Sequence, residues 1–300
     1  MHVFAPFESE EGKELAEQMR EAMSIDDSEF EILSTVRYDP ILMAKNLMVD
    51  GDETGQSRIN GFQNVQGDYP NGASGAKQPQ MVPTENNFFL LPYHWERLKF
   101  SIAFFEWPFD VPYSQLLGEL LSAVRDLNPL DPYKLRVLVS RDGKMKVEAI
   151  AVVKRNDLMS GLKDIMPPGP ENPQYSIYLD TQPTLVSAFT SFKTTKREVY
   201  TSARERALPK DTGPSEVLMY NTRNMITEGS ITNVAFLRDG RWITPAITSG
   251  CLCGVVRHHL LVEGLVEEGN IELASVATGE KILVFNAIIG VCSGVVMPRS

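Results

Sequence analysis

Two Asp-Gly pairs, each beside strand-like runs, constrain the fold of this chain more than any other feature. Asp142-Gly143 divides the run at 136–152, and Asp239-Gly240 leads into the apolar segment RWITP. Such pairs predict tight hairpins, with a type I′ turn at Asp142-Gly143, and hairpins pair their strands in antiparallel fashion. Helix-like segments are mixed with these strands without regular alternation. This pattern predicts an α+β fold rather than a Rossmann or TIM-barrel arrangement.

The other helices and strands are predicted from apolar spacing and from boundary residues. Ser114 is the expected N-cap of a helix that follows it, and a further helix begins near Gly254. The helix at 88–109 carries one apolar face, formed by Trp95, Leu98, Ile102 and Phe105. An acidic helix is predicted at 9–24, and further strands at 30–40, 185–192, 216–221, 231–237 and 281–298.

Two breaks divide this pattern. The segment at 51–80 is rich in Gly, Asn, Gln and Asp and poor in aliphatic side chains, so we predict a flexible surface insertion. The segment PPGPENP at 167–173 is the expected boundary between two subdomains. A chain of 300 residues is long enough for both to bury a core.

Charge and cysteine content exclude several classes of function. The formal net charge of −10 argues against broad binding of nucleic acids or of anionic membranes, and no apolar run reaches the length of a membrane span. The acidic N-terminus does not resemble a targeting peptide, so the cytoplasm is the expected location. Three cysteines suit a reducing compartment, and neither Cys251-x-Cys253 nor the histidines have the spacing of a metal site.

Lys193 stands where an apolar, strand-like run ends and a helical segment begins. A lysine in such a place is usually a solvated surface residue. The functional alternative is a Schiff-base lysine, which needs a rigid mount, an apolar wall and a lowered pKa. Phe189 and Phe192 are the expected wall, and Lys196 and Arg197 are the cations expected to lower the pKa.

Glu228 lies in an apolar strand that continues into Thr232 and Asn233. It is either a carboxylate on a surface turn or the partner of a protonated pyridine nitrogen, which a pyridoxal cofactor requires to act as an electron sink. Thr232 and Asn233 would orient this group or reach the cofactor's phosphate.

A phosphate site is predicted from two further segments. The loop before Gly254 opens directly into a helix, whose first N–H groups, near Val255 and Val256, form a natural phosphate seat. Arg97 lies near the apolar face of its helix, where it is either a snorkelling side chain or a cation that reaches inward to a phosphate.

An amine, a pyridine partner, a phosphate-binding helix and an arginine together match a pyridoxal-phosphate site. Their order along the chain resembles the class IV aminotransferase family, and four segments resemble its fungal aminodeoxychorismate lyases. The resemblance is strongest between residues 185 and 290. The four segments are FEILSTVRYDP, SAFTSFKTTKREVY, EGSITNVAF and TSGCLCGVVRHHLLVEGLVEEGNI.

The resemblance implies a fold like that of D-amino-acid aminotransferases. Residues 1–165 would form a small N-terminal α/β domain that includes the flexible insertion, and residues 166–300 a larger domain with a barrel-like sheet. Pyridoxal 5'-phosphate would lie between the domains. The family also implies a homodimer, because its sites form at a dimer interface.

The lyases of this family convert 4-amino-4-deoxychorismate into 4-aminobenzoate and pyruvate for folate synthesis. By resemblance, Lys193 would bind the cofactor and act as general base, while Glu228 would hold the pyridine nitrogen. Thr35 matches the threonine implicated in protonating the leaving pyruvate enol. Arg37 lies on the same strand face and would bind a substrate carboxylate.

The remaining cofactor contacts are also implied by resemblance. Relatives often carry a threonine where this chain has Ile288, so only the backbone or Asn286 can serve there. Arg197 is preferred to Tyr200 as the contact to the cofactor's phenolic oxygen. The phosphate contacts implied are Arg97, the N–H groups of Val255 and Val256, and Asn286.

Two alternatives to the lyase remain. A class IV transaminase acting on D-amino acids, branched-chain amino acids or amines would share the fold, the cofactor and Lys193, but would need a keto acid as amino acceptor. A non-catalytic relative would keep the scaffold as a binding module and would be colourless when purified.

Overall fold

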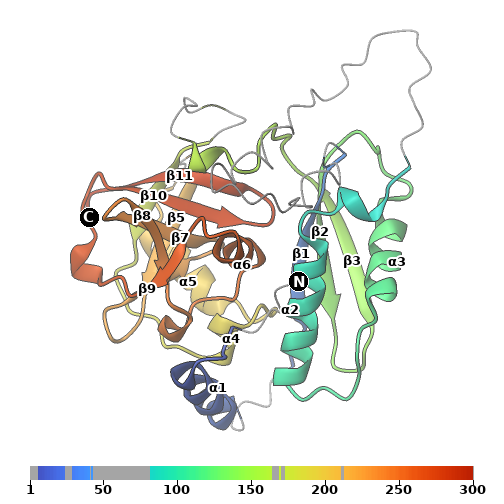
Figure 1. The fold of residues 1–300 in the computed structure, drawn as a ribbon, viewed down its shortest axis with the longest axis horizontal. Coiled ribbons are helices and arrows are strands. Elements are labelled where there is room, and N and C mark those ends of the chain that lie inside the picture. Colours follow the sequence, from blue (N-terminus) through green and yellow to red (C-terminus); the bar gives the residue numbers. More distant parts are fainter. Residues whose placement is uncertain are drawn as a thin grey trace, which may run out of the picture.

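The computed structural model describes residues 6–23, 29–40, 42, 82–163, 169, 173–210 and 213–299. Two sheets lie side by side, with helices packed around them (Figure 1). The insertion predicted at 51–80 and most of the boundary predicted at 167–173 fall outside the described residues.

The smaller sheet is antiparallel, has the order β1-β2-β3 and is covered on one face by two helices. Its strands are β1 (Ile32–Tyr38), β2 (Tyr133–Val139) and β3 (Met145–Ala151), and the helices are α2 (Leu91–Phe104) and α3 (Tyr113–Val124). Alternate residues of β1, such as Ile32 and Val36, pack with Leu98 and Leu116 under the helices. The residues between them on β1, such as Thr35, therefore face the larger sheet.

The larger sheet has eight strands in the order β6-β5-β4-β11-β10-β7-β8-β9. The strands are β4 (Tyr175–Leu179), β5 (Ser215–Tyr220), β6 (Ile226–Gly229), β7 (Asn233–Arg238), β8 (Arg241–Pro245), β9 (Glu267–Gly269), β10 (Lys281–Asn286) and β11 (Gly290–Val296). The sheet curls, so that the edge strand β6 lies next to β7. A tight turn joins these two strands, and in it the N–H of Gly229 donates to the carbonyl of Thr232 at 2.8 Å.

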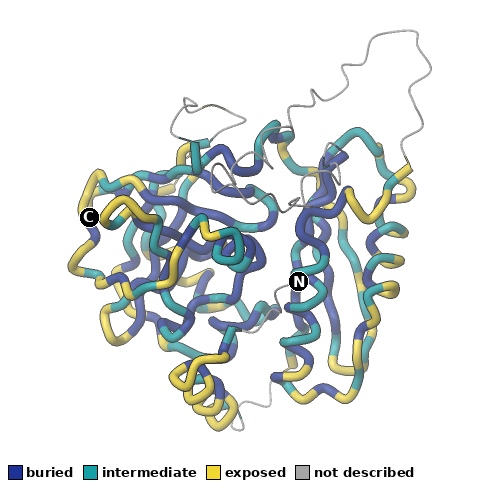
Figure 2. Tube along the Cα trace, viewed as in Figure 1, coloured by how far each residue is buried: buried dark blue, intermediate teal, exposed yellow. Residues whose placement is uncertain are grey.

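Both faces of the larger sheet carry an apolar core. On β10, Ile282 and Val284 pack inside the curl, whereas Leu283 and Phe285 face α6 (Val255–Val262). This alternation is the strand period of two residues. Buried segments accordingly run through the middle of both sheets (Figure 2). Helix α6 lies between the large sheet and α2, at the junction of the two halves.

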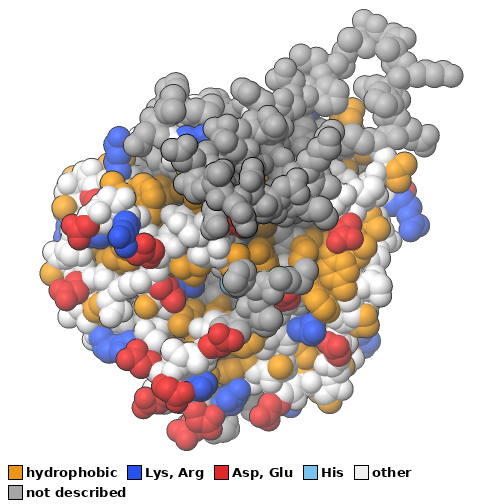
Figure 3. Space-filling view, in the orientation of Figure 1, with side chains coloured by type: hydrophobic (Ala, Val, Ile, Leu, Met, Phe, Trp, Pro, Cys, Tyr) orange, Lys and Arg blue, Asp and Glu red, His pale blue; other side chains and the backbone are white. Residues whose placement is uncertain are grey.

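Three helices flank this junction from the other side. Helix α1 (Glu10–Met23) packs on the short helix α4 (Ala188–Ser191), and α5 (Glu198–Ala207) packs on β5. The outer face of α1 is exposed, and acidic side chains gather at this end of the molecule (Figures 2 and 3). Four short 3-10 helices lie among the described residues, at Glu85–Asn87, Ser160–Leu162, Ile247–Ser249 and Leu273–Ser275. None of the helices in the described part of the chain is long and apolar enough to cross a membrane.

The hairpin predictions are confirmed in topology but not in every turn. Asp239 and Gly240 have φ angles of 50° and 78°, as a type I′ turn requires. The type I′ turn at Asp142-Gly143 is wrong, because only Gly143 has a positive φ. Ser140 instead accepts from the N–H of Gly143 at 2.9 Å and donates its own N–H to Lys144 at 3.0 Å. The result is a longer loop closed by a glycine bulge.

Two other local predictions are corrected. The strand predicted at 185–192 is wrong: Ser187 and Thr190 form a capping box that starts α4 instead. Local side-chain capping therefore overrides the β-like composition. Ser114 lies in the first turn of α3 and is not its N-cap, because that position belongs to Pro112. The short strand β4 was not predicted.

Candidate active site

Lys193 lies in the segment between α4 and α5, and this segment is fixed to the small sheet. The N–H of Leu33 donates to the carbonyl of Lys193 at 2.8 Å, and the N–H of Thr195 donates to the carbonyl of Glu31 at 2.9 Å. The lysine backbone therefore extends the edge of β1, while its flanking helices pack on the large half. This gives Lys193 the rigid mount that a nucleophilic amine needs, although a helix and not a strand precedes it.

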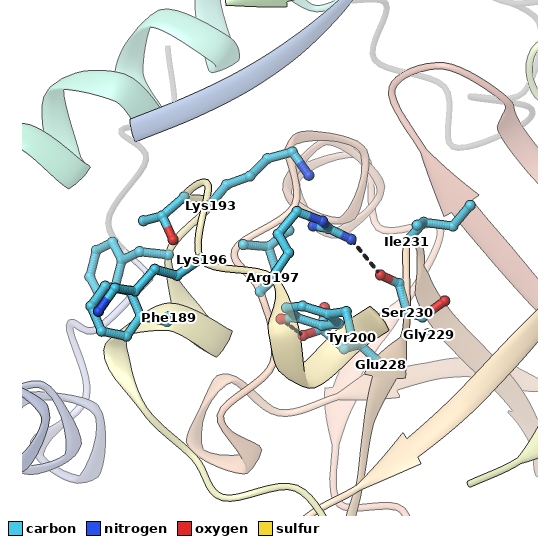
Figure 4. Close-up of a pocket in the computed structure, with 12 residues that line it drawn as sticks. Phe189, Lys193, Lys196, Arg197, Tyr200, Glu228, Gly229, Ser230 and Ile231 are labelled. Carbon is cyan, nitrogen blue, oxygen red and sulfur yellow. Dashed lines mark hydrogen bonds between the residues drawn. The ribbon is translucent and has the colours of Figure 1, made fainter. Parts of the chain in front are cut away.

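The surroundings of Lys193 lower its pKa to about 7, first through burial and then through the guanidinium groups of Arg197 and Arg97. Arg197 is thus confirmed as a cation that lowers this pKa. Lys196 does not have this role, because its amine lies 4.4 Å from the ring centroid of Phe189, and the Lys193 amine points away from it (Figure 4). About half of the amine is therefore neutral at neutral pH, and a neutral amine is a competent nucleophile and base.

Both predicted wall residues line a small pocket together with Lys193, as expected. Phe189 is partly exposed, whereas Phe192 is buried. The Phe192 ring stacks on Phe104 with centroids 3.9 Å apart, so this wall of the pocket is also part of the core.

A cavity of ≈ 350 Å³ opens between the two sheets beside Lys193. It collects residues as far apart in the sequence as Leu33 and Ile289. Nine of the predicted site residues line it, namely Thr35, Arg97, Lys193, Arg197, Thr232, Asn233, Val255, Val256 and Asn286. Among the described residues that line it, none is an aspartate or a glutamate, so its charge is strongly positive. An anionic ligand fits such a cavity.

Glu228 lies in the small adjoining pocket with Lys193 and Arg197 (Figure 4). Its side chain is buried, and burial raises its pKa to about 8. The hydroxyl of Tyr200 donates to Glu228 Oε1 over 2.7 Å, and the N–H of Leu252 also bonds to this carboxyl group; both bonds lower the pKa and so oppose the effect of burial. A cation placed against Glu228 would favour the carboxylate.

Tyr200 and Arg197 flank this pocket in different ways. The Tyr200 hydroxyl is directed to Glu228, with the carbonyl of Thr190 as a second acceptor at 3.1 Å. The Arg197 guanidinium lies 4.8 Å from the Tyr200 ring centroid and donates to the carbonyl of Ser230 at 2.9 Å. Tyr200 therefore supports Glu228, a role that sequence reasoning missed because the two residues are far apart in the chain.

Arg97 is a buried cation, only 5% exposed, and no carboxylate pairs with it among the described residues. Its two protein contacts are neutral: Ser34 Oγ at 3.1 Å and the carbonyl of Cys253 at 3.5 Å. Burial lowers its pKa to about 10. A desolvated guanidinium of this kind normally has an anionic partner, so the cavity offers a site for one.

The N-terminus of α6 faces the same space. Gly254 is its N-cap, and Val255 and Val256, whose N–H groups lack partners within the helix, line the cavity. A Cβ on Gly254 would lie 1.9 Å from Asn233 Oδ1, so only glycine allows this approach. A helix N-terminus opposite a buried arginine fits a phosphate group.

Three of the predicted residues form hydrogen bonds that stabilise the loops lining the cavity. Asn286 donates to the carbonyl of Ile231 at 3.0 Å and accepts from the N–H of Ile288 at 2.8 Å, so it joins two loops. Asn233 donates to the carbonyl of Leu252 at 3.0 Å. Thr232 donates to Glu216 Oε2 at 2.9 Å. Their side chains line the cavity and at the same time fix its walls.

Glu216 was not predicted, and it organises the turn after Glu228. It is fully buried, and it accepts from the N–H groups of Ser230 at 3.0 Å and Ile231 at 3.1 Å as well as from Thr232. A carboxylate inside an otherwise apolar strand was the available signal, since burial of such a group requires several donors.

Arg37 lies on the same strand face as Thr35, as predicted, but its guanidinium does not reach the cavity. It pairs with the buried Asp39 and donates to the carbonyls of Ile288 at 2.8 Å and Val153 at 3.0 Å. Arg37 therefore ties β1 to the turn after β10, and its predicted contact with a substrate carboxylate is not supported.

Two other cations occupy the wall where Arg37 was expected. Arg136 lies opposite Thr35 in the β1–β2 register, Lys134 lies opposite Arg37, and both line the cavity. Their alternation with apolar residues in YKLRVLV was the signal that sequence reasoning missed.

Comparisons with known proteins agree with this geometry. The family model described as "Amino-transferase class IV" matches residues 81–294. The aminodeoxychorismate lyase of Saccharomyces cerevisiae is 30% identical over 257 residues, which cover 71% of this chain and 68% of the yeast protein. A Schizosaccharomyces pombe protein named as a candidate aminodeoxychorismate lyase is 30% identical over 220 residues, which cover 71% of this chain and 86% of that protein.

The solved structures support the same fold. The crystal structure of a candidate amino-acid aminotransferase from Mesorhizobium loti has a TM-score of 0.60 and 22% identity, covering 89% of this chain and 99% of that chain. At this identity the likeness concerns the fold alone. The family match and the yeast relatives extend over most of the sequence. The chain therefore belongs to the class IV aminotransferase family.

Proposed function

We propose that this protein is a 4-amino-4-deoxychorismate lyase, which forms 4-aminobenzoate and pyruvate for folate synthesis with pyridoxal 5'-phosphate as cofactor. The observation that carries the proposal is that one cavity is lined both by Lys193, whose pKa is about 7, and by the hydroxyl-bearing Thr35 of β1. The similarity to the lyase of Saccharomyces cerevisiae supports it.

The residues present fit the cofactor. The uncompensated Arg97 and the N–H groups of Val255 and Val256 would bind its phosphate, and Lys193 would bind its aldehyde carbon. Glu228 would pair with the ring nitrogen, and Tyr200 would keep that carboxylate in place. When bound, the cofactor supplies a protonated ring that accepts the electron pair released at the substrate's amine-bearing carbon.

Two side chains would move the protons of the reaction. Once the substrate amine has taken its place on the cofactor, the free Lys193 Nζ would take the proton from the substrate carbon that bears the amino group, because its lowered pKa leaves about half of the amine unprotonated at neutral pH. The carbon–oxygen bond to the enolpyruvyl group then breaks, and the ring becomes aromatic. The Thr35 hydroxyl donates a proton to the methylene carbon of the leaving enol, which gives pyruvate. Arg136 and Lys134 would bind substrate carboxylates beside Thr35.

The function is tested by incubating the purified protein with 4-amino-4-deoxychorismate and pyridoxal phosphate, without any keto acid. Equal release of 4-aminobenzoate and pyruvate is the expected result. A yellow, cofactor-loaded protein that releases neither product, but transfers an amino group to a keto acid, would be a transaminase instead. A protein that binds no cofactor would be the non-catalytic relative.

Arg37 and Arg136, which lie on the neighbouring strands β1 and β2, should respond differently to substitution. Arg136→Gln should raise KM roughly tenfold or more, because a hydrogen bond to a charged group is worth about 1.5–3 kcal/mol. Arg37→Gln should instead lower the free energy of unfolding by about 3–5 kcal/mol, since it breaks the buried ion pair with Asp39. Steady-state kinetics and urea unfolding of both variants separate the roles. An unchanged KM for Arg136→Gln would remove Arg136 from the substrate site.

The broader organisation belongs to this proposal as well. Residues 1–165 and 166–300 would be the two domains, with the cofactor between them, and the active form would be a homodimer with sites at its interface. The three described cysteines are buried and unpaired, which supports a reducing compartment such as the cytoplasm.

A further inference from the structure

Behind Arg97 lies a hydrogen-bonded pair of buried side chains, Ser34 and His94. Both are fully buried, and neither lines the cavity. Ser34 Oγ lies 3.1 Å from a terminal nitrogen of Arg97 and 2.8 Å from Nδ1 of His94. Ser34 is on the face of β1 that α2 covers, and His94 and Arg97 are one turn apart on α2.

The chemistry of Arg97 fixes the direction of one of these hydrogen bonds. A guanidinium can only donate, so Ser34 Oγ accepts from Arg97. The direction of the bond between Ser34 Oγ and His94 Nδ1 depends on the tautomer of the imidazole, and in either direction this bond holds the hydroxyl oxygen beside Arg97. Burial, together with the nearby Arg97 and Lys193, keeps the pKa of His94 well below the usual range, which agrees with a neutral ring.

We infer that Ser34 and His94 are positioning residues that hold the Arg97 guanidinium toward the cofactor phosphate, an inference that rests on the proposed function. Arg97 has no carboxylate among the described residues to orient it, and its other protein contact is the carbonyl of Cys253 at 3.5 Å. The serine acceptor binds one terminal nitrogen and leaves other N–H groups for the cavity. Neutral partners orient the cation without neutralising it, so its full charge remains for the phosphate.

A comparison of two ligands separates phosphate binding from the general integrity of the site. Pyridoxal phosphate and pyridoxal share the aldehyde and the ring and differ only in the phosphate. The ratio of their affinities therefore reports on the phosphate site, which Arg97 shares with the N–H groups of Val255 and Val256. Both affinities can be measured by titrating the cofactor-free, full-length protein and following the visible absorbance band, without any turnover.

Ser34→Ala and His94→Leu should each lower the affinity for pyridoxal phosphate about tenfold, the value of one hydrogen bond to a charged group, and leave the affinity for pyridoxal unchanged. His94→Asn should retain the wild-type ratio, because its side-chain amide can accept from Ser34 or donate to it in place of Nδ1.

Ser101→Ala is the matched control. Ser101 is a buried serine of α2, the same helix that carries Arg97. Its hydroxyl donates to the backbone carbonyl of Arg97 at 2.9 Å and does not contact the guanidinium. The same atom is removed, and the affinity ratio should not change. A ratio that is unchanged in Ser34→Ala, or that falls equally in Ser101→Ala, overturns the inference. A wild-type protein that does not prefer pyridoxal phosphate to pyridoxal would overturn the proposed phosphate site itself.

Discussion

Lys193→Ala is expected to abolish the release of 4-aminobenzoate and pyruvate and to leave the fold intact. The substitution removes both the amine that would bind the cofactor and the base that would take the substrate proton. General-base catalysis alone contributes about 10²–10⁴ in rate, so loss of both roles should lower the rate by more than about 10⁴-fold. The measurement is the rate of formation of both products by the purified, cofactor-loaded variant and wild type.

Lys196→Ala is the control for this variant. It removes a neighbouring lysine from the same segment, whose amine lies over Phe189 and not in the cavity. It should retain the wild-type rate. Equal activity of Lys193→Ala and the wild type would exclude Lys193 as the nucleophile and base, whatever the products are.

The same variant also has an expected effect on the stability of the cofactor-free protein. The folded state lowers the pKa of Lys193 from its ordinary value of 10.5 to about 7. Between these values the unfolded chain binds more protons than the folded one, so wild-type stability should fall as pH decreases from 10.5 toward 7. Lys193→Ala should lack this part of the pH dependence. Urea unfolding at several pH values measures it.

Glu228→Gln is expected to lower kcat by at least about 10²-fold, the scale of losing one preorganised electrostatic partner. The amide keeps the size of the side chain and can still accept from Tyr200, but it carries no negative charge to stabilise a protonated ring nitrogen. The rate of product formation at saturating substrate and cofactor is the measurement. Glu198→Gln, which changes an exposed glutamate at the start of α5, should have no effect.

Tyr200→Phe provides a graded test of the same pair. It removes the 2.7 Å hydrogen bond to Glu228, one of the contacts that favour the carboxylate. We expect a smaller loss of kcat than for Glu228→Gln, and little further loss when the two are combined. Additive losses would show that Tyr200 acts elsewhere in the site.

Local chemistry in the sequence was sufficient for much of the fold. The Asp239-Gly240 turn, the helix that begins after Gly254 and the apolar face of α2 follow from rules that act within one turn or one strand. The same rules explain the failure at 185–192, where the Ser187 capping box was present in the sequence but the apolar run was weighted more heavily. The α+β fold class needed no information about which segments meet, whereas the strand order of the larger sheet came only from the structure.

Lys193 and Glu228 could also be singled out from the sequence. A lysine directly after an apolar run and a glutamate within an apolar strand are visible in short segments, and the family resemblance implied their roles. What the sequence could not decide was which side chains meet. Periodicity placed Arg37 and Thr35 on one face of β1, yet only the tertiary structure shows that Asp39 and Ile288 occupy the Arg37 guanidinium.

The neighbouring strand β2 brings Lys134 and Arg136 to the cavity, and α5 brings Tyr200 to Glu228. These pairings join residues that are far apart in the chain. They depend on how two sheets pack and on which buried charges find partners, and neither is encoded in any short segment. The sequence by itself determined most of the strands, the Asp239-Gly240 turn and the identity of the reactive groups. The tertiary structure decided which residues lie beside these groups, because burial and hydrogen-bond partners are properties of the packed molecule.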